Sequence, residues 1–298
     1  MTNKTNEQYR INLFKDRQTK SNIITDPEEI RKLDEQLKKE YYEKLKSGAE
    51  TKKKEKKIVQ PDSSGSTQPF ISNNQNIIKS DYVQIPQLNK IISKFELPNY
   101  NNLNWQNTHF KLHENGLLMP TIPEFMTYFN DVVASYKSKG KNPLFDATGN
   151  PLNEKEIEDI YFHLTKNHIA VYGKQKGAWA WLDAKFNEDN EMKISSEHRT
   201  ITDANGNKSL KPNKIETLES CLNEDCYVDF KLLNSQGLPN TKSSKQKYVL
   251  GENIYYWYPR DKQVAGFYAY SSGAYLDCDW DPADGGSDLG VFGVGDAG

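Results

Sequence analysis

The last 35 residues restrict the fold of this chain more than any other feature. Residues 264–298 contain no Lys, Arg, Glu, Gln, Met, His, Asn, Thr or Ile, although the rest of the chain is rich in Lys, Asn and Glu. From Phe267 to Asp279, small or apolar residues alternate with Tyr, Ser and Asp. A period of two is typical of β-strands, in which successive side chains point to opposite faces. The segment therefore predicts a hairpin, either an ordinary half-buried one or one whose outward face binds a partner.

Two segments upstream have the pattern of amphipathic helices. Thr121 and Glu124 form a capping box, and an apolar face then continues to Tyr136, with Gly140 as a natural stop. A second helix is expected at about 153–163, where apolar residues again recur at helical spacing.

Short strands are expected at 254–259, 264–270 and 274–278, which are rich in aromatic and apolar residues. Residues 185–245 are polar with turn signals, and we expect long loops over few strands there. Residues 78–110 give no clear assignment. Because helices come first and short strands last, the sequence predicts the α+β class.

Residues 1–75 are expected to form a polar N-terminal arm, and residues 76–298 the folded domain. The arm has one amphipathic helix that begins after Asp26 and ends near Gly48, followed by a charged and Ser-rich linker. Two interpretations of this helix stay open. It docks onto a partner or oligomerises, or it packs against its own domain.

Composition excludes several partners and locations. A formal net charge of -2 argues against nucleic acid as the main partner. No apolar run approaches the roughly 20 residues that span a bilayer, and the polar N-terminus lacks the apolar core of a signal peptide. We therefore expect a protein that does not span a membrane, located in the cytoplasm or in a virus particle. Three cysteines, at 221, 226 and 278, are too few for a disulfide framework.

Several motifs with catalytic or metal-binding associations are weak here. The G-x-G-x-x-G at 293–298 needs a helix directly after it, and the sequence ends there. The Asp residues at 277–288 suggest calcium, but Pro282 occupies the position at which an EF-hand needs Gly. The five histidines form no H-x-x-H or H-E-x-x-H pattern, and no Ser lies in a nucleophile-elbow context. We expect no metal, no cofactor and no catalytic residues.

Five short motifs stand in the C-terminal part of the chain. They are Trp-Tyr-Pro-Arg at 257–260, Val-Ala-Gly-Phe at 264–267, Ser-Ser-Gly-Ala-Tyr-Leu-Asp-Cys at 271–278, Asp-Pro at 281–282 and Leu-Gly-Val at 289–291. Together they resemble the variable proteins of diversity-generating retroelements. In that family a reverse transcriptase copies a template repeat with errors at adenines, and the copy replaces the 3′ end of the target gene. The resemblance covers about 110–298 and implies a C-type lectin fold with short hairpins and two helices, related to formylglycine-generating enzymes.

The residue types of the tail fit that mechanism. An AAC codon with both adenines randomised yields Tyr, Asp, Ser, Gly, Ala and Phe, but never Lys, Glu, Gln or Met. An AGG codon yields Trp or Gly, which fits Trp280 and Gly266. Phe292 stands where family members often keep Arg, so the end of the variable segment (about 264–292) stays open. The residues inferred to be diversified, solvent-facing and ligand-binding are Tyr268, Tyr270, Ser272, Tyr275, Asp277, Asp279, Trp280, Asp281, Asp284 and Asp288.

The sequence thus predicts a ligand-binding protein rather than an enzyme, with a hypervariable C-terminal recognition surface. Its partner is an unidentified macromolecule, by expectation a protein, and the aromatic residues are its anchors. We expect replacement of Tyr275 by Ala to weaken binding without unfolding the chain. Two alternatives remain. One is an enzyme of the formylglycine-generating type, which needs a paired-cysteine or copper site. The other is a structural virion protein whose tail does not vary.

Overall fold

The computed structural model describes residues 78–297, apart from residues 167 and 172–173. The expected N-terminal arm and its helix lie outside the described residues. Three α-helices are present in the described part: α3 (Trp105–Glu114), α4 (Ile122–Lys137) and α5 (Glu154–Thr165). None of the three is both long and apolar enough to cross a membrane.

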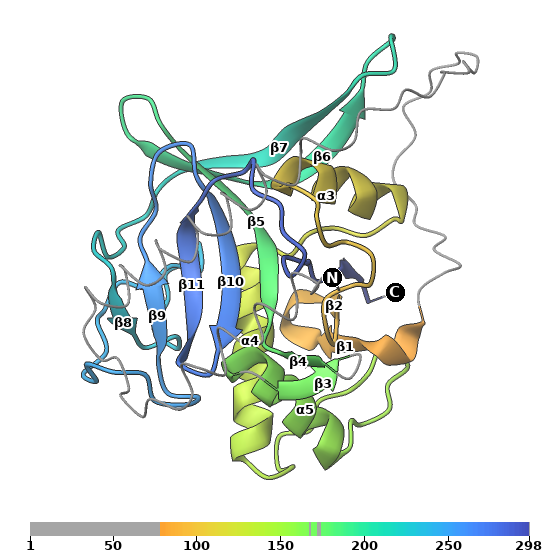
Figure 1. Ribbon diagram of the computed structural model, residues 1–298, viewed down its shortest axis with the longest axis vertical. Helices are drawn as coiled ribbons and strands as arrows, with labels where there is room; N and C mark the ends of the chain where they lie inside the picture. Colours follow the sequence, from red (N-terminus) through yellow and green to blue (C-terminus); the bar gives the residue numbers. More distant parts are fainter. Residues whose placement is uncertain (1–77, 167, 172–173, 298) are drawn as a thin grey trace, which may run out of the picture. The chain divides into compact units, whose positions relative to one another are not determined.

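A seven-stranded sheet forms the centre of the fold (Figure 1). Its strands are paired antiparallel, except that β9 and β11 run parallel. In spatial order they are β7 (Lys208–Thr217), β6 (Met192–Thr202), β5 (Trp179–Glu188), β10 (Val264–Tyr270), β11 (Gly273–Trp280), β9 (Ile254–Trp257) and β8 (Cys226–Val228). Helices followed by and packed on an antiparallel-rich sheet confirm the α+β class.

Two smaller sheets and two 3₁₀ turns complete the described part. In one sheet, strands from both ends of the folded region meet, since Val294 pairs with Ile92. The described part of the G-x-G-x-x-G segment, 293–297, therefore contains the strand β12 (Val294–Asp296). A dinucleotide site requires a helix directly after the first glycines instead. The remaining elements are η1 (Lys79–Asp81), β1 (Tyr82–Ile85), η2 (Pro86–Leu88), β2 (Lys90–Ser93), β12 (Val294–Asp296), β3 (His168–Val171) and β4 (Lys174–Lys176).

The two expected helices are confirmed, the first together with its expected capping box. Thr121 and Glu124 cap each other's backbone amides, the Thr121 amide donating to Glu124 Oε2 at 2.8 Å. Asn153 and Glu156 make the same reciprocal pair at the start of α5. After α4 the chain turns through Gly140 at φ 80°, a left-handed conformation that costs glycine little.

The main core lies between the sheet and the two helices α4 and α5. Phe125 and Phe129 of α4 pack on Phe267 of β10, with ring centroids 4.7 and 5.4 Å apart. Phe292 packs on Phe125 from the other side, at 5.3 Å. The apolar set of the C-terminal segment all faces this core and is buried, which confirms one half of the expected alternation. It comprises Phe267, Ala269, Ala274, Leu276 and Cys278.

The expectation of long loops at 185–245 is wrong for residues 192–217. There β6 and β7 form the longest hairpin in the described part, joined through the predicted turn at Asn205-Gly206, where Gly206 has φ 82°. Most side chains of β7 are exposed, so its residues show no apolar alternation by which a strand is recognised. Residues 78–110 contain β1, β2 and α3, so the fold has a third helix beyond the two expected.

Candidate functional site

The face of the central sheet turned away from α4 and α5 carries a row of aromatic side chains. The row crosses five neighbouring strands because the register aligns one aromatic residue from each. Tyr268 of β10 lies opposite Trp179 of β5 and Tyr275 of β11. Tyr255 of β9 pairs in turn with Tyr275 and with Tyr227 of β8. Two of the five residues come from the C-terminal segment.

The rings in this row contact one another closely. Tyr268 stacks on Tyr275 with centroids 4.5 Å apart and on Trp280 at 5.7 Å, both nearly parallel. The Trp257 indole N–H donates a hydrogen bond to the Tyr268 hydroxyl at 3.1 Å. Aromatic pairs in such arrangements contribute about 0.5–1.5 kcal/mol beyond the area they bury. The five residues of the row, together with Trp257 and Trp280, therefore form one packed layer, which we call the aromatic layer.

Gly266 makes room for one member of this layer. A β-carbon on Gly266 would lie 2.4 Å from a carbon of the Trp280 ring and 2.5 Å from the next. The Trp280 ring therefore occupies the space above Gly266, and its edge meets Trp181 at a centroid distance of 5.1 Å. The two residues that fit an AGG codon are thus in direct contact.

Four of the ten residues expected to face solvent are buried, and for these the expected exposure is wrong. Neighbouring rings and loops cover them, although they do lie on the face opposite the helices. Asp277 is fully buried, and its Oδ1 accepts a hydrogen bond from the Asp279 amide at 2.9 Å. The exposed fractions are 3% for Tyr268, 5% for Tyr275, 0% for Asp277 and 4% for Trp280.

The other six lie at the edge of the layer and reach solvent. Ser272 and Asp281 are exposed, and the other four are half-buried. Asp281 organises its own turn by accepting the amide of Ala283 at 2.9 Å. Together these positions form what we call the rim: Tyr270, Ser272, Asp279, Asp281, Asp284 and Asp288.

One rim carboxylate is held by a cation of the same domain. The Arg260 guanidinium contacts Asp279 Oδ2 at 2.5 Å and Asp225 Oδ2 at 3.3 Å. Its planar group also lies over the Tyr258 ring, 4.9 Å from the centroid. Arg260 thereby ties the end of β11 to the segment before β8.

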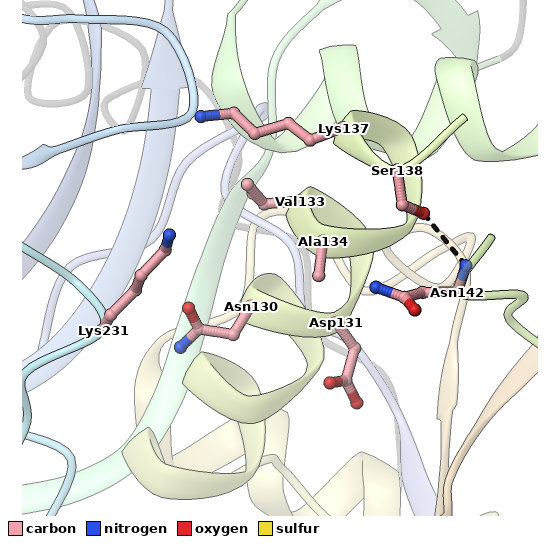
Figure 2. A pocket seen from close by; sticks show the side chains of 8 residues that line it. All are labelled: Asn130, Asp131, Val133, Ala134, Lys137, Ser138, Asn142 and Lys231. Atoms are coloured by element: carbon pink, nitrogen blue, oxygen red, sulfur yellow. Dashed lines mark hydrogen bonds between the residues drawn. The ribbon is translucent and has the colours of Figure 1, made fainter. Parts of the chain in front are cut away.

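A cavity of about 470 Å³ lies elsewhere, against α4 (Figure 2). Asn130, Val133 and Lys137 line it from the helix, and Lys231 reaches it from the loop after β8. Its one carboxylate, Asp131, accepts a hydrogen bond from Gln87 at 2.7 Å. No lining residue comes from the C-terminal segment, and the lining brings together no pair of groups suited to acid–base or nucleophilic chemistry.

The cysteines are not poised for thiolate chemistry. Burial raises the pKa of Cys278 well above its ordinary value, and the same cause raises that of Cys226 to about 11. Burial also raises the pKa of Cys221. A thiol with a raised pKa stays protonated near neutral pH, whereas the nucleophile and metal ligand is the thiolate.

One polar cluster was missed from the sequence. Within the described residues, His109, Asp183 and His198 form a group of three potential metal ligands. His109 and His113 are four residues apart on α3, which places both on one helix face. The four-residue spacing was visible in the sequence, but it places both histidines on one face only if residues 105–114 are helical.

Comparisons with protein-family models, with curated proteins and with solved structures find no match for this chain.

Proposed function

We propose that this chain is a ligand-binding protein whose C-terminal segment forms a hypervariable recognition surface, diversified by adenine-directed retroelement mutagenesis on a C-type-lectin-like domain. The observation that carries the proposal is the residue content of 264–298. This segment lacks Lys, Glu, Gln and Met in a chain otherwise rich in Lys and Glu. Randomised AAC codons never encode these four residues, whereas an ordinary protein surface commonly has Lys and Glu.

The arrangement of the segment supports a recognition role. Its strands β10 and β11 are central in the sheet, and their apolar side chains are anchored in the main core. A scaffold of this kind holds the rim in position while rim side chains change, because exposed substitutions usually alter stability by only about ±0.5 kcal/mol. Ser272, at the tip of the hairpin, and Asp281, in the turn after it, are the exposed rim positions and therefore the most open to a partner.

The aromatic layer has a different part in this proposal. Tyr268, Tyr275 and Trp280 are too buried to supply large contact area unless the surface opens, so they serve as a rigid platform. A rigid platform lowers the entropy cost of binding, because fewer groups must be ordered on association. The rim carries four Asp carboxylates, which favours a partner with a basic surface.

Sequencing of the 3′ end of the gene and several kilobases of downstream DNA, across many members of the source population, tests this proposal. We expect a near-repeat of codons 264–292 that differs only at adenines and lies beside a reverse transcriptase gene. Variation should concentrate at rim codons, and changes at layer codons should be rarer because they affect folding. An invariant 3′ end with no repeat nearby would refute diversification and would leave an ordinary acidic surface.

A further inference from the structure

Helix α3 packs against the central sheet at a point where three metal-binding side chains meet. His109 comes from α3, Asp183 from β5 and His198 from β6. All three are buried, with exposed fractions of 0%, 2% and 4%. One ligand atom of each lies within 4.8 Å of the others. The cluster contains no residue of the C-terminal segment, so it is independent of the recognition surface proposed above.

His109 has no hydrogen-bond partner in this cluster. Both of its ring nitrogens are buried without one. Its Nε2 lies 3.6 Å from Asp183 Oδ1, too far for a hydrogen bond. Both ring nitrogens therefore lie among buried polar groups without a partner, and buried polar atoms are rarely left in that state.

Asp183 and His198 hold the other two ligand atoms in place. Asp183 Oδ2 accepts the His198 backbone amide at 3.0 Å, which fixes the orientation of the carboxylate. Its other oxygen, Oδ1, lies 2.5 Å from His198 Nδ1, so the carboxylate is held between the two histidines at the centre of the cluster.

The distances suit a small tetrahedral ion. Zinc bonds of about 2.0–2.2 Å place neighbouring ligand atoms about 3.3 Å apart. His109 Nε2 and Asp183 Oδ1 are 3.6 Å apart, and His198 Nδ1 and Asp183 Oδ1 are 2.5 Å apart. The first pair is already near the required separation. The second is a hydrogen bond that opens by about 1 Å when an ion replaces its proton.

Two neighbouring side chains, His113 and Trp105, limit the cluster to three protein ligands. His113 directs its Nδ1 lone pair to the Thr200 amide, which donates to it at 3.1 Å, so this lone pair is already engaged. The Trp105 ring lies against both His109 and His198, at centroid distances of 4.4 and 4.9 Å, and shields them from solvent.

We propose that His109, Asp183 and His198 bind one divalent transition-metal ion, zinc in preference, which fastens α3 to strands β5 and β6. Two imidazoles and one carboxylate suit zinc better than magnesium or calcium, which prefer oxygen ligands alone. Three protein ligands leave a fourth position for water. A neutral imidazole that binds the ion through Nδ1 has its proton on Nε2, so the His198 ring adopts that tautomer when the metal bond replaces its hydrogen bond to Asp183.

The test uses the untagged full-length protein, dialysed against a chelator and then reconstituted with zinc or cobalt(II). We expect about one equivalent of metal per chain by mass spectrometry, and the visible absorption of tetrahedral cobalt(II). Because a ligand that binds only the folded state stabilises it, zinc at a hundredfold excess over its Kd should raise Tm by roughly 5–10 °C. The rise should disappear in excess chelator.

The chain provides a matched control. His163 and Glu96 form a second buried imidazole–carboxylate pair, 2.6 Å apart, which is not among the clusters of three potential ligands. His109→Gln should abolish stoichiometric binding and the Tm rise, whereas His163→Gln should keep both if it folds. The metal content and the Tm rise of the wild-type protein test the proposal even if a variant does not fold. Substoichiometric metal on the wild type, or equal binding by folded His109→Gln, would overturn the proposal.

Discussion

Replacement of Gly266 by Ala should destabilise the protein through one identifiable contact. The added methyl group would lie 2.4 Å from the Trp280 ring, well inside van der Waals contact. The ring cannot move freely, because it is stacked on Tyr268 and meets Trp181 edge-on. Overpacking of this kind costs about 1–3 kcal/mol, offset by about 0.5 kcal/mol from the lower backbone entropy of Ala. The expected net loss is about 1–2 kcal/mol.

A double-mutant cycle separates this clash from other effects of the substitution. Trp280→Ala removes the ring and alone should cost about 3–5 kcal/mol, as large buried aromatic residues do. In that background Gly266→Ala should become neutral or slightly stabilising, because the methyl group then enters vacated space. The coupling energy should therefore be close to the penalty of the single substitution.

Urea unfolding followed by circular dichroism measures each free energy of unfolding. Gly295→Ala is the control, since its added methyl group would lie 3.6 Å from the Ile91 side chain, an ordinary contact. This control should change stability by no more than about 0.5 kcal/mol. If Gly266→Ala lowers the free energy of unfolding by the same amount in the Trp280→Ala background as in the wild type, the close contact is not the cause. The described packing of the aromatic layer is then wrong.

Three further predictions concern the cap, the layer and the rim. Thr121→Ala removes the α4 capping box and should cost about 1 kcal/mol in urea unfolding; no change would mean that the cap is redundant. Tyr275→Ala should cost about 3 kcal/mol, whereas Tyr275→Phe, which keeps the ring and removes the hydroxyl that lies 3.3 Å from Ser272, should cost under about 1 kcal/mol; equal losses would exclude ring packing as the source. Ser272→Ala and Asp281→Asn, at exposed positions, should each leave Tm within about 2 °C in a thermal scan, and a larger drop would contradict their assignment to the rim.

The prediction for Tyr275 replaces the one made from the sequence. Alternation along β11 placed Tyr275 on the face away from the helices, which the structure bears out. Alternation was also taken to mean exposure to solvent, and that step was wrong. A face away from one core is still buried when aromatic residues of neighbouring strands cover one another, and only the cross-strand register reveals those neighbours.

Elements with local sequence signals were predictable. The capping box at Thr121, the apolar periodicity at 153–163 and the alternation in 264–278 each depend on residues a few positions apart, and the structure has helices and strands there. The β6–β7 hairpin lacked such a signal because few of its side chains are buried. Helix α3 was missed because it buries polar residues such as His109 on the sheet.

Contacts between residues far apart in the sequence depend on the tertiary structure. Trp280 lies over Gly266 because β10 and β11 pair in one register, and His109 joins Asp183 and His198 because α3 packs across strands that are some 70–90 residues away in sequence. Local spacing contains no information about such contacts. They follow from the burial of apolar faces on opposite sides of one sheet, which brings together side chains that the chain itself keeps far apart.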